Sequence, residues 1–105
     1  MPKRLAFRMN LFPGNVAEYE KRHDEIFPDL VTALKEVGIS DYSIWFDPED
    51  HHLFAIMTVA DDNTLSELPQ KEVMKRWWSF MADIMATNTD ASPIQIPLRQ
   101  VFYLA

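Results

Sequence analysis

The chain has 105 residues and contains no cysteine. This excludes disulfides, zinc–thiolate sites, iron–sulfur clusters and thiol nucleophiles together. A secreted chain of this length would often carry disulfides, so their absence favours the cytoplasm. Glycine is also scarce, with only two residues, and this excludes a glycine-rich phosphate-binding loop.

Basic residues are few: 10 Lys and Arg stand against 16 Asp and Glu, for a formal net charge of -6. Phosphate backbones and anionic membrane surfaces are bound by clustered positive charge, so this balance disfavours both. No apolar run approaches the length of a membrane span, and residues 1–10 do not have the pattern of a signal peptide. We therefore expect a cytoplasmic protein that binds neither nucleic acid nor membrane.

Apolar residues are plentiful, at 48% of the chain, and aromatic residues make up 12%, including three tryptophans. This is enough for a globular fold, and the length predicts one domain over residues 1–105. Large aromatic side chains in so small a domain must pack in the core, line a pocket or form an interface.

Alternating hydrophobicity predicts four strands, at residues 4–12, 41–47, 51–60 and 96–104. Apolar residues spaced three or four apart predict helices at 16–37 and 70–85, with a short helical turn between Asp61 and Pro69.

Single residues predict where these helices begin and end. Pro28 should split the first helix, and Gly38 should end it. Asn15 is placed to cap its start. Thr64 and Glu67 have the spacing of a capping box.

The element order β-α-β-β-α-β predicts an α+β, ferredoxin-like subunit, with two helices over one face of a four-stranded antiparallel sheet. The other face would be open. The strands nevertheless carry large apolar groups on both faces, with Trp45 opposite Tyr42 and Phe46. An open aromatic face needs a cover, and two-fold dimers are the commonest assembly, so we expect a homodimer.

Tyr19 and His23 lie one helical turn apart on the apolar face of the first helix. Polar groups on such a face need hydrogen-bond partners. One interpretation is a buried pair that backbone carbonyls satisfy. The other is a pocket between helix and sheet, in which His23 acts as a general acid/base.

Three more aromatic residues are candidates for the same pocket. Tyr42 either packs in the core or dimer interface, or points into the pocket beside Ile44. Trp77 and Trp78 are adjacent, so they point about 100° apart on a helix and cannot both face the core. One of them could pack on a loop or partner chain, or offer a platform for a sugar.

Two polar segments are further candidates for a site. His51 and His52 follow the acidic turn 47–50, but their spacing matches no metal motif, and a solvated hairpin is the better interpretation. We therefore predict no metal site. The polar stretch 86–93 is either a plain connection or the rim of a pocket.

Several segments together resemble one enzyme family. Residues 18–28, EYEKRHDEIFP, resemble the EYxxRHxxIWPEL stretch of the L-rhamnose mutarotases. Further matches follow in the family's order and spacing, across essentially the whole chain: YSI at 42–44, RWW at 76–78, MADIM at 81–85, NTDASP at 88–93 and VFYL at 101–104.

The resemblance implies a dimeric α/β barrel and interconversion of the α and β anomers of L-rhamnose, without metal or cofactor. It also implies roles for individual residues. His23 matches the family's catalytic acid/base, and the sugar-contacting positions match Tyr19, Tyr42, Trp77 and Trp78.

Mutarotation requires ring opening, rotation about C1–C2 and reclosure. We expect His23 to protonate the ring oxygen and later to take that proton back. The conjugate base could be a tyrosine, a carboxylate or water.

The chain departs from the family pattern at Phe27, where tryptophan is frequent, and at Thr89 and Ala91, where the loop usually has proline and asparagine. These differences bear on the identity of the sugar more than on the reaction.

Four alternative functions remain open. They are a mutarotase for another deoxy sugar such as L-fucose, a non-catalytic sugar-binding module, a purely structural dimer domain, or another enzyme on this scaffold, such as a small monooxygenase or an isomerase.

Overall fold

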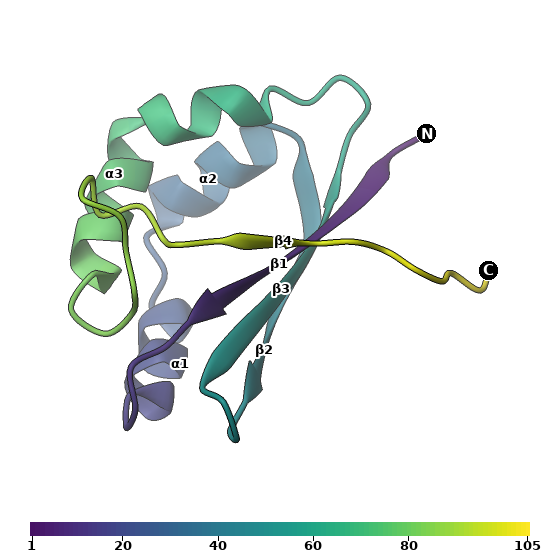
Figure 1. The fold of residues 1–105 in the computed structure, drawn as a ribbon. Helices are drawn as coiled ribbons and strands as arrows, with labels where there is room; N and C mark the ends of the chain where they lie inside the picture. The colour runs from purple at the N-terminus through teal and green to yellow at the C-terminus, as the bar shows by residue number, and fades with distance from the viewer.

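The computed structural model describes all residues, 1–105. Its elements in chain order are β1 (Lys3–Asn10), α1 (Val16–Asp24), α2 (Pro28–Glu36), β2 (Ile39–Asp47), β3 (His52–Val59), η1 (Leu65–Gln70), α3 (Glu72–Met81) and β4 (Ile96–Leu98). The strands form one antiparallel sheet in the order β2-β3-β1-β4. Figure 1 shows the helices together on one side of this sheet. The α+β class and the four-stranded antiparallel sheet are therefore confirmed.

The first predicted helix is split at Pro28, as expected. Pro28 is the first residue of α2, where its fixed φ suits a helix start and its missing N–H is not needed. Gly38 follows α2 with φ +97°, and a Cβ at this position would lie 3.0 Å from Cβ of Asn63. Its prediction as the residue that ends the helix is confirmed, because only glycine fits this backbone and this space.

Asn15 and Thr64 are the N-cap residues of α1 and η1, as predicted, but neither side chain forms a capping hydrogen bond. Asn15 stands just before α1, but its side-chain amide donates to the carbonyls of Phe12 and Pro13, both at 3.1 Å, instead of capping the helix. Thr64 makes no side-chain cap either, and it is Oδ1 of Asn63 that accepts from the N–H of Leu65, at 3.1 Å. Pro69 lies inside η1, not between η1 and the next helix as predicted.

The second long helix is shorter than the predicted range 70–85. It ends at Met81 because the next residues turn back to β1. There the N–H of Phe12 donates to the carbonyl of Ile84 at 2.9 Å, and Leu11 bridges to Met85. Tertiary hydrogen bonds thus replace the last helical turn. None of the helices has the length and apolar character needed to cross a membrane.

The last strand is also shorter than predicted. It was expected over 96–104 but pairs with β1 only from Ile96 to Leu98. Beyond it, Val101 is 87% exposed and Phe102 is 77% exposed, and the C-terminus runs away from the sheet (Figure 1). Alternating hydrophobicity predicts a strand only where one face of the segment is buried. In a single chain nothing covers the apolar side chains of residues 101–104.

The core lies between the sheet and the helices. Residues of β3 alternate between buried and partly exposed, and the buried ones face the helices. The main cluster comprises Met9, Leu11, Tyr19, Leu30, Leu53, Ala55, Met74, Trp77, Met81, Ile84 and Met85. A smaller cluster comprises Val37, Ile39, Met57 and Val59. Tyr19 is the one buried residue in these clusters with a hydroxyl group. It lies at the boundary between the apolar core and a cavity.

Candidate active site

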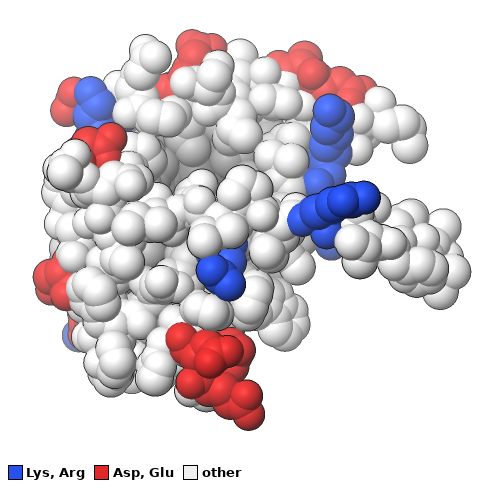
Figure 2. Space-filling view, viewed as in Figure 1, with Lys and Arg blue, Asp and Glu red and all other residues white.

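A cavity of about 440 Å³ opens between the helices and the sheet. This is within the size range of small-molecule sites, roughly 300–1,000 Å³. Of its 23 lining residues, 17 are hydrophobic, so the few polar groups must determine what binds and how it is oriented. Figure 2 shows a hollow on this face of the molecule, bordered mainly by uncharged residues.

His23 and Tyr19 both line this cavity from α1, with ring centroids 4.3 Å apart. Nδ1 of His23 lies 2.9 Å from the backbone carbonyl oxygen of Tyr19. A carbonyl oxygen carries no proton, so Nδ1–H donates this bond. In the neutral ring Nε2 is therefore unprotonated and free for a ligand. The sequence suggested either a buried pair satisfied by backbone carbonyls or a pocket with a general acid/base. Each applies in part, because one ring nitrogen of His23 bonds a carbonyl and the other is available to a ligand.

The protonation state of His23 follows from its surroundings. Burial lowers its pKa below the usual 6.5, against smaller opposing effects from the Tyr19 carbonyl and Asp24. At neutral pH the ring is therefore uncharged. The structure thus presents His23 as a proton acceptor at Nε2 that can become a donor after one transfer.

Both tyrosines at the site are held in the neutral form. Burial raises the pKa of Tyr19 well above its usual value of 10, and the nearby Tyr42 raises it further. Burial raises the pKa of Tyr42 to about 12. These phenols can donate hydrogen bonds to a ligand, but neither is ionised enough at neutral pH to act as a base.

Tyr42 faces the cavity because it lies two residues before Ile44 on β2, and alternate residues of a strand point to the same side. Between the pairs Ser40–Thr58 and Ser43–Ile56, β2 has one residue more than β3, and Asp41 adopts φ +46°. This β-bulge shifts the alternation by one position, so that Ile39, which precedes it, faces the helices on the same side as Tyr42 and Ile44. All three residues line the cavity, as the sequence analysis expected for Tyr42.

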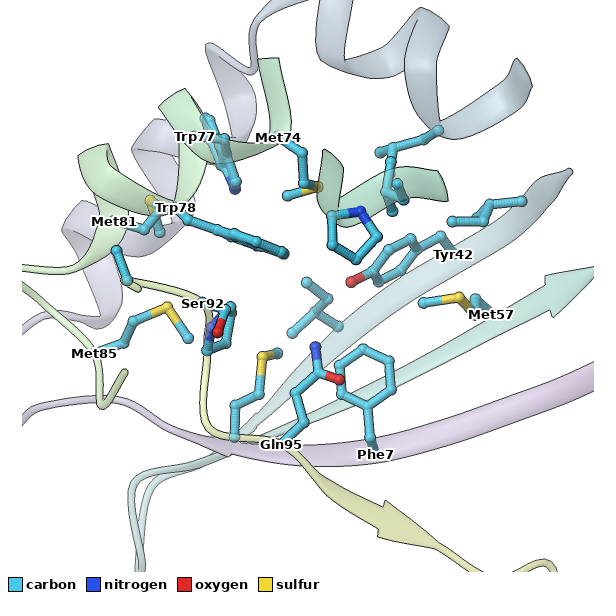
Figure 3. A pocket seen from close by; sticks show the side chains of 18 of the residues that line it. Phe7, Tyr42, Met57, Met74, Trp77, Trp78, Met81, Met85, Ser92 and Gln95 are labelled. Carbon is cyan, nitrogen blue, oxygen red and sulfur yellow. The ribbon is translucent and has the colours of Figure 1, made fainter. Parts of the chain in front are cut away.

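The two tryptophans take different positions, as their adjacency predicts. Trp77 is buried, and its ring meets His23 edge-on at 5.2 Å and Phe27 edge-on at 5.1 Å. Trp77 therefore packs against the His23 ring and also lines the cavity. Trp78 is only half buried, and Figure 3 shows its ring extending along the cavity. Of the two, Trp78 offers the more accessible platform.

The polar stretch after α3 is the rim of the pocket, not a plain connection. Asp90, Ala91, Ser92, Pro93 and Gln95 all line the cavity. The carboxylate of Asp90 accepts hydrogen bonds from the N–H of Ser92 at 3.0 Å and from its hydroxyl. The side-chain bond from Ser92 is the largest cause that lowers the pKa of Asp90. The sequence analysis did not single out Gln95, because the rim that it considered ended at residue 93.

Arg22 is a second residue that the sequence analysis did not select. It precedes His23 and ties α1 to the end of α3. Its guanidinium contacts Glu18 at 2.8 Å, Asp83 at 2.9 Å and the Phe80 carbonyl at 2.7 Å, and lies 4.4 Å from the Phe80 ring centroid. Its side chain is only 11% exposed. The hint in the sequence was its place beside His23 in the Tyr-x-x-Arg-His segment.

The histidines of the β2–β3 hairpin are not part of this site, since neither lines the cavity. His52 has a potential ligand atom within 4.8 Å of those of Asp47 and Asp50. In Figure 2 an acidic group lies at the lower end of the molecule, where Figure 1 places this hairpin. None of these three residues lines the cavity that contains His23.

Comparison with known sequences finds one family. The sequence profile of the L-rhamnose mutarotases matches residues 4–104. The chain is 56% identical to an L-rhamnose mutarotase of Acidiphilium cryptum over 102 residues, 97% of this chain and 98% of the relative. It is 50% identical to one of Mesorhizobium japonicum over 105 residues, which is the full length of both chains.

Comparison with solved structures agrees. The crystal structure of an L-rhamnose mutarotase of Formosa agariphila matches with a TM-score of 0.90 and 47% identity, covering 98% of this chain and 99% of that one. A Pseudomonas aeruginosa protein matches with a TM-score of 0.59 and 18% identity, covering 96% of this chain and 95% of that one. The second likeness concerns the fold alone.

Proposed function

The chain belongs to the L-rhamnose mutarotase family, and we propose that His23 transfers the proton in its reaction. The enzyme is an isomerase that interconverts the α and β anomers of L-rhamnose. The observation that supports this role is that the two ring nitrogens of His23 have different environments. Nδ1–H donates to the Tyr19 carbonyl at 2.9 Å, while Nε2 is unprotonated at the wall of the cavity.

The neutral ring favours one order of events. Nε2 of His23 first takes the proton of the anomeric hydroxyl, O1–H. The C1–O5 bond then breaks as C1=O1 forms, and O5 receives the proton from Nε2–H. Because O1 and O5 are both attached to C1, one imidazole can serve both oxygens. This order is the reverse of the one expected from the sequence, because burial keeps His23 uncharged before the reaction.

Reclosure repeats these transfers in reverse. The open-chain aldehyde rotates about C1–C2, O5 attacks the other face of C1, and its proton returns through Nε2 to O1. The steps transfer protons only and consume no cofactor. General acid/base catalysis of this kind contributes roughly 10²–10⁴-fold.

The remaining aromatic residues bind the sugar in this proposal. The neutral phenols of Tyr19 and Tyr42 donate hydrogen bonds to sugar oxygens, including the developing charge at O5. Trp78 stacks on the C–H face of the ring, and Trp77 contacts the sugar while holding His23. The apolar part of the wall, which includes Met57 and Leu68, suits the C6 methyl group of a deoxy sugar.

We further propose that the chain is a homodimer of ferredoxin-like subunits, joined into an α/β barrel through the open face of the sheet. Three large apolar residues are exposed there: Trp45 at 65%, Ile96 at 45% and Leu98 at 40%. Nε of Arg8 is buried on the same face without a hydrogen-bond partner. An unpaired buried guanidinium nitrogen is costly, so an acceptor from a second copy would stabilise it.

The chain acts as a single domain in the cytoplasm in this proposal, where its free monosaccharide would be found. Neither a nucleic acid nor a membrane is proposed as a partner.

The reaction is tested by NMR saturation transfer between the anomeric protons of L-rhamnose, with and without protein, and with L-fucose and D-glucose in parallel. We expect protein-dependent exchange for L-rhamnose and much less for the other two. Exchange with L-fucose alone would change the sugar but not the chemistry. Binding of L-rhamnose without faster exchange would overturn the proposed role of His23.

A further inference from the structure

The segment that leads into β4 contributes a polar side chain to the cavity. Figure 3 shows Gln95 at the wall opposite Trp77, with its amide pointing into the open space. Its neighbours on the cavity wall are largely apolar, among them Phe7 and Met57. An amide in such a wall is conspicuous, because polar groups there determine which ligand fits.

The other polar residues of this loop form hydrogen bonds with one another. The Asp90 carboxylate accepts both the N–H and the hydroxyl of Ser92. The side-chain amide of Asn88 donates to the Ser92 hydroxyl at 3.1 Å and to the carbonyls of Ser92 and Pro93. The Ser92 hydroxyl thus both donates and accepts within the loop. These bonds shape the rim and occupy Oδ1 of Asp90, while Oδ2 of this carboxylate makes no hydrogen bond within the loop.

Gln95 differs because its amide makes no hydrogen bond within the protein, so its carbonyl oxygen and both N–H groups are free for a ligand. Its backbone, in contrast, is anchored on both sides. The N–H of Ile94 donates to the carbonyl of Ala86 at 3.1 Å, and Ile96 pairs with Arg8 in the sheet. Gln95 is exposed in the free protein, and its anchored backbone keeps the amide at the cavity, where a ligand could replace the water around it.

We propose that Gln95 is a specificity-determining residue that binds two adjacent ring hydroxyls of the sugar. Its oxygen accepts from one hydroxyl and its nitrogen donates to the next, a pairing that depends on the stereochemistry of both carbons. The proposal rests on anomer exchange occurring in this cavity. His23 forms its hydrogen bond with the Tyr19 carbonyl and none with Gln95, so Gln95 acts on binding and on the choice of sugar, not on proton transfer.

The test replaces Gln95 with methionine, which has similar length and no amide. Saturation transfer at several L-rhamnose concentrations then separates KM from kcat. We expect Gln95→Met to raise KM about tenfold, equivalent to ~1.4 kcal/mol, with kcat unchanged within a factor of about two. Gln70→Met is the matched control, because Gln70 ends η1, is exposed and does not line the cavity.

A double-substitution cycle distinguishes a direct contact from a change of shape. The 2-, 3- and 4-monodeoxy derivatives of L-rhamnose are compared between wild type and Gln95→Met. Removing the two hydroxyls that Gln95 binds should weaken wild type and have little further effect on the variant. Equal penalties in both proteins at all three positions, or a KM matching the Gln70→Met control, would overturn the proposal. Wild type that shows no exchange would instead overturn the proposed reaction, so the two failures are distinguishable.

Discussion

The helix-covered face of the sheet and its open face are both apolar, yet they differ in their polar groups. On the covered face, Tyr19, His23 and Tyr42 meet in a cavity. On the open face, Trp45 is 65% exposed and the Nε of Arg8 has no partner. The covered face has a cavity with room for a small molecule. The open face leaves an apolar side chain exposed and a buried N–H without an acceptor, and a second protein surface could cover the one and bond the other.

The comparison teaches that exposed apolar area and a binding cavity are different features, even on one sheet. A cavity combines apolar walls with a few oriented polar groups, each anchored from behind. An interface presents a broad apolar surface with little depth. Substitutions on each face should therefore affect different measurements.

The largest effect is expected at His23. His23→Asn keeps a side-chain N–H near the Tyr19 carbonyl but removes the titratable Nε2. Anomer exchange of L-rhamnose, measured by saturation transfer, should fall roughly 100-fold or more while circular dichroism is unchanged. His51→Asn is the matched control, because asparagine tolerates the positive φ of 60° at His51. A folded His23→Asn enzyme with wild-type exchange would contradict the mechanism.

On the open face, Trp45→Glu should separate the proposed dimer. Each dimer would bury two unpaired carboxylates, so its dissociation constant should rise roughly 100-fold or more in sedimentation experiments. Thr32→Glu on the exposed surface of α2 is the control and should leave assembly unchanged. If wild type is a monomer, or Trp45→Glu still dimerises fully, the open face is not the interface.

A smaller effect is expected at Arg22, which joins α1 to the end of α3 behind the cavity. Arg22→Gln loses the contacts to Asp83 and to the Phe80 ring, and should lower Tm by about 5 °C. Arg22→Lys should recover part of this loss. Arg76→Gln breaks an exposed pair with Asp29, and should change Tm little. Equal losses at Arg22 and Arg76 would contradict this difference.

The smallest effect concerns pH. Since the pKa of His23 is lowered in the folded chain, the unfolded chain binds more protons once pH drops to about 6.5. The contribution of His23 to stability is therefore present above 6.5 and is lost as pH falls through the folded pKa. Exchange should decline over the same range, because the protonated ring cannot accept a proton.

Denaturation curves of wild type and His23→Asn, measured from pH 7.5 to pH 5, test this dependence. The free energy of unfolding of wild type should fall more steeply with acid than that of the variant. Parallel curves would show that burial does not lower this pKa.

Much of the fold could be predicted from the sequence, because the predictive signals were local. Alternation located β3 within a residue or two of its bounds, and Pro28 and Gly38 marked where α2 begins and ends. The site prediction was also local, since one helical turn necessarily places His23 beside Tyr19. The bulge at Asp41 was not predicted, because it depends on how β2 pairs with β3. Gln95 was missed because its neighbours in the cavity come from distant segments.

The amino-acid sequence by itself determined the class of fold, the split of the first helix and the aromatic and histidine groups of the site, since these depend on neighbours within a turn or a strand. Only the tertiary structure decided that Nδ1 of His23 donates to a carbonyl, that Trp77 supports the ring while Trp78 lies along the cavity, and that the loop after α3 closes the rim. It also ended β4 at Leu98. The physical reason is that burial, and with it the protonation state and the free capacity for hydrogen bonds, depends on which distant residues pack together.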